Sequence, residues 1–403
     1  MRKTKQQKKP NITLAKWLID RTDTDSYRAG ILEGWKHPKV DGALMELVGG
    51  RDRFLEQARS LENETVAGRT GRLRFDWREV NTSIRQIHYD VAIIPALCEL
   101  ENIEDPRQHQ LKMISNVKKR REEVKDCEWL CAYYDDILTK LEKGNEKTQA
   151  EDDLRFQCLN AIARQEEPVW ERVFSARVLN DSKLFRNEYR DRVVTVLMNY
   201  SPYYIDGMND DEILDAHEIH SYAQTVEWKG PLQYRLDGQV PIDTSCNYYG
   251  TVLNTQTMEH AVAYALPGCR RIMTIENKAN YESMCYAEDT LYIFCHGFFT
   301  PKEVRFLRRI CDIVPPECEF YHWGDMDFGG ISIFQFIKGQ VFPKVMPYKM
   351  GADDFQKAVE AGAGIPLKAD TRAKLEGKDA GLLTELKDMI LKTDLTIEQE
   401  RLL

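Results

Sequence analysis

Long hydrophobic runs are absent from this sequence. No stretch of about 18 consecutive apolar residues occurs in the 403-residue chain, and its first ten residues, MRKTKQQKKP, lack the apolar core that a secretory signal requires. The sequence therefore predicts neither a membrane span nor a signal peptide, and we expect a cytoplasmic protein. A composition of 42% hydrophobic and 30% charged residues is that of a globular chain with room for two or three domains.

Closely spaced cysteine pairs are also missing. The ten cysteines are scattered and none of them forms a CxxC pair, so neither a zinc site nor a disulfide framework is indicated. We expect free, buried thiols instead, because several cysteines stand in apolar or helical surroundings. These are Cys98, Cys158, Cys246, Cys285 and Cys295.

An excess of basic residues is missing as well. The net charge of -9 argues against a protein that coats nucleic acid nonspecifically, because lysine and arginine supply most of that affinity. Any contact with DNA must then be local. Basic residues gather at positions 2–9, at positions 118–121 and around a glycine-containing loop, where Arg69, Arg72 and Arg74 are candidates for phosphate binding. A solvated boundary between a helix and a loop is the alternative explanation of this last group.

Hydrophobic patterning divides the chain into three regions. Residues 1–155 are predicted to form a mainly helical N-terminal arm, since Val117, Leu130 and Leu141 recur at helical spacing among many charges. Residues 156–255 contain helical stretches near 159–170 and 183–198 and a strand at 233–236, a mixture that favours a winged-helix (CAP-like) module. Residues 256–403 form the third region, which ends in a C-terminal tail.

The third region has the pattern of a parallel α/β sheet. From Arg271 onward, the strands RIMTI, LYIFC and EFYHW alternate with helices, as parallel strands with crossover helices do. The helix after LYIFC has a clear start, because Thr300 can cap it, Pro301 suits its first turn and Glu303 completes a capping box.

Three acids follow the strands of this region. Glu276 comes directly after the first strand, and Asp325 and Asp327 follow a later strand within HWGDMDFGG. Ligands bind at the carboxyl edge of open α/β sheets, so strand ends that are distant in sequence can bring these carboxylates together. The glycines of the same motif would let a phosphate backbone approach closely. A surface turn or a helix cap would explain each acid alone, but their joint pattern favours a site.

This set of carboxylates fits a hard divalent cation. Mg²⁺ (or Mn²⁺) prefers oxygen ligands and keeps several waters, so Asp325, Asp327 and substrate phosphate oxygens could complete its shell. The cation would activate a water and stabilise charge on the phosphate. Glu276 would be either a third ligand or the general base, and both roles stay open. The residues thus predict metal-dependent cleavage of a phosphodiester.

The same motifs resemble known families. IENKANY around Glu276 and HWGDMDFGGISIF around Asp325 resemble the Toprim fold of topoisomerases, bacterial primases and several nucleases. A closer resemblance is to the JetD family, the nuclease subunits of Wadjet anti-plasmid systems, in which a helical arm and a winged-helix-like module precede the Toprim domain. SARVLNDSKLF at 175–185, CHGFFTPKEVRFLRRI at 295–310 and LTIEQERLL at 395–403 also resemble this family. The resemblance covers most of the chain after residue 155.

The resemblance implies a function. By it, Glu276, Asp325 and Asp327 correspond to the Toprim metal-site acids, and the chain would cut double-stranded DNA, in particular circular plasmid DNA. It implies a homodimer with one site per strand and, as partner, the SMC-type, condensin-like ATPase complex (JetABC-like) that presents the DNA. Lys183 in NDSKLF would contact DNA unless it is a solvated helix charge. Two acids of the tail, Glu398 and Glu400, could assist the site or merely add solubility.

Two other functions stay open. Type IIB topoisomerase A subunits (topoisomerase VI A type) have a similar architecture but cut DNA with a tyrosine, whose nearest equivalents here are Tyr189, Tyr203 and Tyr204. None of them stands in the arginine-led double-tyrosine motif that this chemistry needs. A noncatalytic DNA-binding subunit is the other alternative, and the presence of all three acids argues against it. His217 and His220 could share a helical face and bind a metal, although an amphipathic surface helix also explains them.

Overall fold

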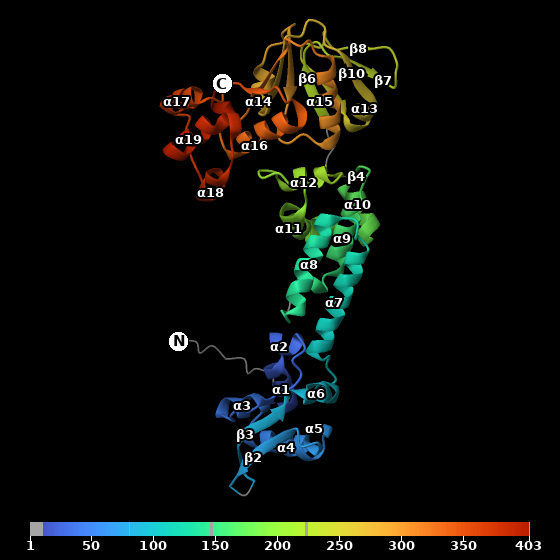
Figure 1. Cartoon of the computed structure of the whole chain (residues 1–403), viewed down its shortest axis with the longest axis vertical. Helices are drawn as coiled ribbons and strands as arrows, with labels where there is room; N and C mark the ends of the chain where they lie inside the picture. The colour runs from blue at the N-terminus through green and yellow to red at the C-terminus, as the bar shows by residue number, and fades with distance from the viewer. Residues whose placement is uncertain (1–10, 80, 146–147, 222–224, 403) are drawn as a thin grey trace, which may run out of the picture. The chain divides into compact units, whose positions relative to one another are not determined.

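The computed structural model describes residues 11–79, 81–145, 148–221 and 225–402. The chain divides into two compact units, unit 1 (Met1–Ala163) and unit 2 (Arg164–Leu403). The predicted boundary after residue 155 falls inside helix α9 (Asp153–Ala163), and unit 1 extends to the end of that helix. Figure 1 shows both units, with the helices and some of the strands labelled.

Unit 1 combines helices with a small antiparallel sheet of order β1-β3-β2. A mainly helical region was predicted here, and this sheet was missed although β2 (Leu73–Arg78) alternates apolar and charged residues, the period of two that is typical of a half-buried strand. Leu73 and Phe75 are buried whereas Arg74 between them is exposed. The other strands are β1 (Trp35–Lys36) and β3 (Ser83–Asp90).

Helices make up the rest of unit 1. The predicted helical spacing is confirmed in α7 and α8, where Val117, Leu130 and Leu141 are fully buried. The helices before α9 are α1 (Leu14–Thr22), α2 (Asp25–Arg28), α3 (Gly42–Val48), α4 (Arg51–Asn63), α5 (Val66–Arg69), α6 (Ile94–Glu101), α7 (Pro106–Glu122) and α8 (Glu128–Glu142), with 3-10 turns η1 (Val91–Ile93) and η2 (Thr148–Glu151).

The first part of unit 2 is mostly helical. The helix predicted at 159–170 is present only as far as Ala163, the end of α9, and Pro168 disfavours helical backbone at the residue before it. The helix predicted at 183–198 is present as η3 followed by α11. The elements are β4 (Val169–Trp170), α10 (Glu171–Leu179), the π-helical turn η3 (Phe185–Tyr189), α11 (Arg190–Tyr200), α12 (Asp210–Ala216) and β5 (Ile219–His220).

A six-stranded mixed sheet of order β14-β13-β11-β12-β6-β9 organises the rest of unit 2. β11 (Arg271–Ile275) lies between β12 (Thr290–Phe294) and β13 (Glu319–Trp323) and is parallel to both. These strands confirm the three predicted segments, although β12 begins one residue earlier than LYIFC. The sheet is completed by β6 (Thr225–Lys229), β9 (Thr251–Asn254) and β14 (Met346–Pro347), and a second sheet contains β7 (Gln233–Leu236), β8 (Ile242–Asp243) and β10 (Ala261–Ala265).

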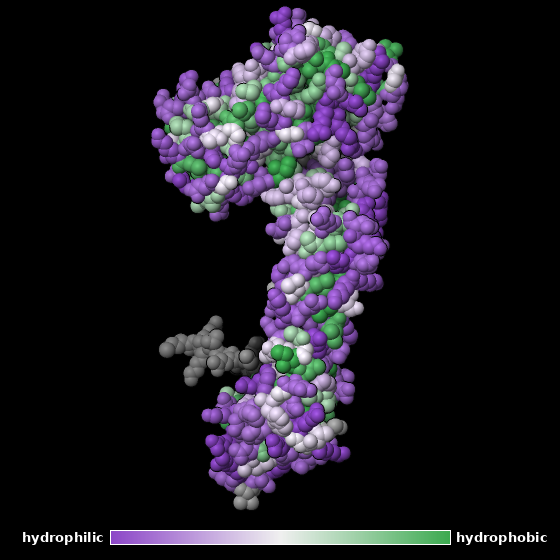
Figure 2. All heavy atoms as spheres, viewed as in Figure 1, coloured by the Kyte–Doolittle hydropathy of each residue, from purple (hydrophilic) through white to green (hydrophobic). Residues whose placement is uncertain are grey.

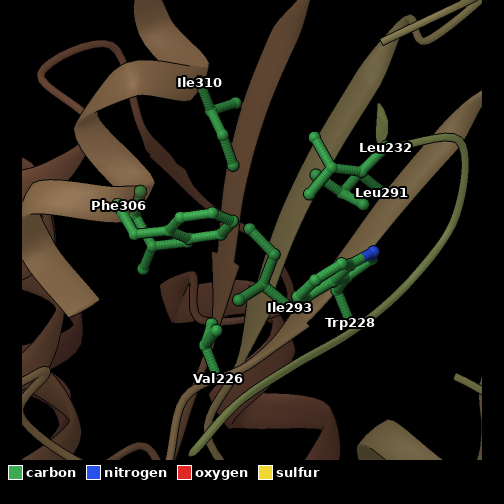
Figure 3. Close-up of a pocket in the computed structure, with 8 residues that line it drawn as sticks. Val226, Trp228, Leu232, Leu291, Ile293, Phe306 and Ile310 are labelled. Atoms are coloured by element: carbon green, nitrogen blue, oxygen red, sulfur yellow. The ribbon is translucent and has the colours of Figure 1, made fainter. Parts of the chain in front are cut away.

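Helix α15 (Pro301–Ile313) packs against the six-stranded sheet. Its predicted capping box is confirmed, because the Thr300 side chain accepts a hydrogen bond from the Glu303 backbone and the Glu303 carboxylate accepts one from the Thr300 backbone. Figure 3 shows the apolar layer between α15 and strands β6 and β12, which is lined by Val226, Trp228, Leu232, Leu291, Ile293, Phe306, Leu307 and Ile310. This packing holds β12 in the sheet beside β11.

The last helices of unit 2 lead the chain back to the sheet. In Figure 1, α17, α18 and α19 form a red group beside α16. Strand β16 (Leu395–Thr396) then pairs with β15 (Ile365–Pro366), and Ile397 bridges to Met326. The remaining elements are α13 (Thr255–His260), α14 (Lys278–Ser283), α16 (Phe328–Phe336), α17 (Ala352–Glu360), α18 (Ala369–Gly377), α19 (Thr384–Thr393), η4 (Ile337–Val341), η5 (Gly381–Leu383) and η6 (Gln399–Leu402).

The prediction for the cysteines is confirmed in part. All ten are free thiols, and Cys98, Cys158 and Cys295 are buried. The prediction was wrong for Cys246 and Cys285, which are exposed because both lie in loops.

Among the described helices, none is both long and apolar enough to cross a membrane, and Figure 2 shows hydrophilic residues over most of the visible surface.

Candidate active site

The register of β11 and β13 brings two strand ends together. Ile275 pairs with Trp323, so Glu276 and Gly324 leave the sheet side by side. The Glu276 backbone N–H donates to the Trp323 carbonyl at 3.0 Å, and the Asp325 backbone N–H donates to the Glu276 carboxylate oxygen Oε2 at 3.1 Å. Glu276 and Asp325 therefore meet at the carboxyl edge of the parallel strands, where the sequence predicted them.

Asp327 begins the next helix beside the same loop. It is the N-cap of α16, and its Oδ1 accepts a hydrogen bond from the Gly330 backbone N–H at 2.8 Å. Met326, between the two aspartates, is fully buried, whereas Asp325 and Asp327 are both half-buried. The N-terminus of α16 also favours negative charge here. The three predicted acids are thus brought together by β11, β13 and α16.

Two glycines leave the space that the acids occupy. A Cβ atom at Gly324 would lie 2.5 Å from Glu276 Oε2 and 2.7 Å from His322 Nε2, and one at Gly330 would overlap the Asp325 carbonyl oxygen. Any other residue at these positions would displace the carboxylate or the backbone. The glycines are therefore required by the packing of the acids themselves, whereas the sequence analysis explained them by the approach of a phosphate.

The surroundings of the three acids oppose their negative charge. Burial, together with the smaller effect of the Asp325 carboxylate, raises the pKa of Glu276 to about 8. Burial, Asp327 and the tail acids Glu400 and Glu398 raise the pKa of Asp325 to about 6. Burial also raises the pKa of Asp327, as does Glu398. A bound cation would relieve this repulsion.

The chemistry of the donor set fits a cation that keeps part of its own water. Glu276, Asp325 and Asp327 offer carboxylate oxygens, the ligands that Mg²⁺ and Mn²⁺ prefer. Within the described ranges, no group of three or more His, Cys, Asp or Glu side chains is arranged so that all of them could hold one metal ion. A cation here would take one or two oxygens from the protein and the others from water and a phosphate. Such an open shell suits metal-assisted hydrolysis.

The tail contributes a residue that the sequence analysis missed. Gln399 is fully buried, its backbone N–H donates to Asp325 Oδ1 at 2.6 Å, and its side-chain Oε1 accepts a hydrogen bond from the Asn277 backbone N–H at 3.0 Å. The sequence pointed instead to the neighbouring acids Glu398 and Glu400, which are exposed. A neutral glutamine among charged residues gave no signal.

Helix α12 contributes a second missed residue, Glu212. It forms a capping box with Asn209, and its Oε1 also accepts a hydrogen bond from the Phe298 backbone N–H at 3.1 Å. A Cβ atom at Gly297 would overlap this oxygen, and the φ of Gly297 is +129°, so the position requires glycine. Burial raises the pKa of Glu212, and its charge acts on Glu276. The capping box was visible in the sequence, but the contact with Phe298 was not.

The basic candidates lie on exposed positions of both units. In unit 1, Arg69 ends α5, Arg72 precedes β2, and Arg74 lies in β2 with its guanidinium over the Trp35 ring at 5.0 Å. In unit 2, Lys183 lies in the turn before η3 and not in a helix. DNA binding by these residues stays a prediction. The basic positions 2–9 lie outside the described residues.

The histidine candidates do not share a helical face. Helix α12 ends at Ala216, so the prediction for His217 and His220 was wrong. His217 Nε2 lies 2.8 Å from Ser201 Oγ, and His220 Nδ1 lies 2.8 Å from Asp215 Oδ1. These local partners account for both histidines.

The tyrosine candidates lie in the first part of unit 2. Tyr189 ends η3 and is half-buried. Tyr203 packs its ring edge-on against His217, with 5.2 Å between the ring centroids, and burial raises the pKa of Tyr204. Tyr203 remains 56% exposed beside this ring contact, and burial makes a reactive phenolate at Tyr204 harder to form.

Comparisons with known proteins point to one family. Residues 239–403 match the model of a family described as Wadjet protein JetD, C-terminal. The matched region contains Glu276, Asp325, Asp327 and Gln399. The chain is also 25% identical over 336 residues to the Wadjet protein JetD of Bacillus cereus (strain Q1), and the alignment covers 80% of each chain. The similarity therefore extends into unit 1.

Proposed function

Because this chain belongs to the JetD family through residues 239–403, we propose that it is the nuclease subunit of a Wadjet-type defence complex. Its reaction is the Mg²⁺- or Mn²⁺-dependent hydrolysis of phosphodiesters in double-stranded, circular plasmid DNA. The convergence of Glu276, Asp325 and Asp327 at one sheet edge supports this proposal most strongly. Clustered carboxylates with raised pKa values are typical of functional sites.

We infer the roles of the acids from their positions. Asp325 and Asp327 hold the cation through carboxylate oxygens, and the bridge between Met326 and Ile397 fixes the backbone between them. The bound cation supplies a Lewis acid for the phosphate charge and for water activation. Glu276 either joins the cation shell or takes the proton of the attacking water. The Asp325 backbone N–H engages Glu276 Oε2 and so orients its carboxylate for either role.

The same proposal assigns folds to the three regions. Residues 256–403 form a Toprim domain with a C-terminal tail, which is supported by parallel strands with acids at their carboxyl ends. Residues 156–255 were expected to form a winged-helix (CAP-like) module, but β6 and β9 of this range belong to the six-stranded sheet of β11, β12 and β13, so we assign that module only to the part before β6. Residues 1–155 form the N-terminal arm. Lys183, Arg69, Arg72 and Arg74 are assigned to DNA binding because they are exposed cations.

A cleavage assay tests the proposed activity. The purified chain is incubated with circular DNA, with and without Mg²⁺ or Mn²⁺, alone and with its SMC-type partners. Asp325→Ala should lose at least about a hundredfold in rate, because a key electrostatic stabiliser of the transition state is removed. Asp353→Ala is the matched control, since this exposed aspartate lies in the first turn of α17. Full activity of Asp325→Ala would refute the site.

The chemical course of cleavage is tested separately. Hydrolysis by water predicts that Tyr189→Phe retains cleavage and that no protein stays attached to the DNA ends. A protein–DNA adduct that survives detergent would instead support a tyrosine transesterase. A chain that binds DNA but never cleaves it, with all partners present, would support a noncatalytic subunit.

The proposed partners are a second copy of the chain and an SMC-type ATPase complex (JetABC-like). Two protomers match the two strands of a duplex, since one site acts on one phosphodiester at a time. The negative net charge of -9 leaves DNA delivery to the ATPase complex. Mass measurement in solution and assays on mixed wild-type and Asp325→Ala protomers test this. Mixed dimers should nick one strand, whereas a strict monomer would refute the two-site arrangement.

A further inference from the structure

The tail segment, residues 395–402, is built into the wall of the acid site. Ile397 is fully buried and exchanges two backbone hydrogen bonds with Met326, at 2.9 and 3.2 Å. Met326 is also fully buried and stands between the two aspartates. Gln399 follows two residues later and is again fully buried. The tail segment therefore lies along the acid motif as part of the core.

Gln399 connects the two loops that carry the acids. Its backbone N–H donates to Asp325 Oδ1 at 2.6 Å, after β13. Its side-chain Oε1 accepts from the Asn277 backbone N–H at 3.0 Å, directly after Glu276. Its carbonyl accepts from Asn280 Nδ2 at 3.0 Å, in α14. One buried residue thus contacts both sides of the site.

The arrangement around Gln399 is not the one that stability alone would favour. Gln399 Nε2 and Asn280 Oδ1 are buried and, among the described residues, have no hydrogen-bond partner. An unpaired buried amide group is unfavourable for folding. The exposed acids on either side, Glu398 and Glu400, add negative charge beside Asp325. A function of the tail in the site explains why such an arrangement persists.

We propose that Gln399 is a positioning residue that holds the Glu276 loop and the Asp325 loop at a fixed separation, so that both carboxylates can serve one divalent cation. The inference rests on the proposed function. Carboxylates of like charge move apart unless their backbones are tied together. The N–H of Gln399 also occupies Asp325 Oδ1, which orients this carboxylate and leaves Oδ2 for the cation.

Mn²⁺ binding without DNA tests the inference directly. Free Mn²⁺ is followed by electron paramagnetic resonance during titration of the purified full chain. Gln399→Ala should weaken Mn²⁺ binding about 10- to 100-fold, the usual effect of removing a group that orients a metal ligand. Gln356→Ala is the matched control, because it removes an exposed glutamine of α17 whose Nε2 bonds to Glu360 at 2.8 Å. The control should bind Mn²⁺ like the wild type.

Two further variants separate positioning from folding. Gln399→Glu keeps an oxygen that can accept the Asn277 N–H, so it should bind Mn²⁺ more tightly than Gln399→Ala. Asn280→Ala removes the second attachment of the tail and should weaken Mn²⁺ binding in the same direction. The double variant should lose less than the product of the two single effects, because both act through one contact. Thermal unfolding without metal verifies that each variant is folded.

The outcomes distinguish the inference from the proposed function. With Gln399→Ala, a higher Mn²⁺ concentration should restore cleavage to near the wild-type maximal rate, because the acids themselves remain. Equal Mn²⁺ affinity of Gln399→Ala and the wild type would overturn the inference alone. A wild-type chain that binds no Mn²⁺ would overturn the proposed function and the inference with it.

Discussion

Two aspartates, one in each unit, have pKa values that their surroundings shift in opposite directions. In unit 1, Asp153 accepts hydrogen bonds from the Arg120 guanidinium at 2.9 and 2.6 Å, and Arg120 lowers the pKa of Asp153 to about 2. In unit 2, burial and neighbouring acids raise the pKa of Asp325 to about 6. One carboxylate is neutralised by its partner, whereas the other stands among like charges.

This contrast separates charges that stabilise a fold from charges that are available to a ligand. Arg120 and Arg121, from the basic run at 118–121, are bound by Asp153 and Asp135 within unit 1, so this run is a charged helix face, as the sequence indicated. Asp325 has no such partner charge among the groups that act on it. Repulsion that the fold alone does not relieve supports our proposal that the site takes a cation.

The largest expected effect is on the cleavage rate, and it distinguishes an aspartate of the candidate site from Asp153. Asp327→Asn, beside Asp325, should lower the cleavage rate at least about a hundredfold, because a carboxylate that holds the cation is lost. Asp153→Asn should leave the rate within about twofold, the range expected of a change that touches only a stabilising ion pair. Both rates are measured on circular DNA at saturating Mg²⁺. Equal losses would mean that the two environments do not differ in function.

The next expected effect is the dependence of Mn²⁺ affinity on pH. Protons compete with the cation for carboxylates of raised pKa, about 8 for Glu276 and about 6 for Asp325. Mn²⁺ affinity should therefore rise between pH 6 and pH 8, by up to about tenfold per pH unit for each proton released, and level off above pH 8. Calorimetric titration at several pH values measures this. An affinity independent of pH would contradict the raised values.

Stability should respond to pH with opposite sign for the two aspartates. The pKa of Asp153 is lowered, so its contribution is present above about pH 4 and is lost as the pH falls through about 2. The pKa of Asp325 is raised, so in the metal-free protein its unfavourable contribution is absent below about pH 4 and is complete once the pH has risen through about 6.

Substitutions measure these two contributions at pH 8 without metal. Asp153→Asn should lower the free energy of unfolding by about 1 kcal/mol, since solvent screens a side chain that is 40% exposed. Asp325→Asn should raise it by about 1 kcal/mol, because a repelled charge is removed and an acceptor for the Gln399 N–H is kept. Urea unfolding provides both values, and a loss of stability in Asp325→Asn would contradict the comparison.

The smallest effect concerns the exposed cations of unit 1. Arg72→Ala should weaken DNA binding a few-fold and reduce the slope of log affinity against log salt by about one, if this residue contacts a phosphate. Lys112→Ala is a suitable control, because Lys112 is bound by Glu104 at 2.5 Å. Fluorescence anisotropy at several salt concentrations measures both slopes. Identical slopes would remove Arg72 from the DNA-binding candidates.

Features set by neighbours in sequence were the ones that could be predicted. The capping box of Thr300 and Glu303 and the strand before Glu276 depend on residues within one turn or one strand, so their signals are local. Strand β2 was missed although its apolar and charged residues alternate, because the strand is only six residues long and lies between segments with helical spacing. Cys246 and Cys285 were predicted to be buried from the apolar residues near them in sequence, but those residues do not cover their side chains in the fold.

The sequence by itself determined which acids end the parallel strands, because strand alternation and the position after a strand are properties of the local chain. Only the tertiary structure decided what surrounds those acids. Gln399 reaches Asp325 across 74 positions and Glu212 reaches Phe298 across 86, and no periodicity or cap encodes such pairs. The raised pKa values are likewise a product of burial and of charges from distant segments. Residue types set the available chemistry, whereas long-range packing sets the distances at which charges act.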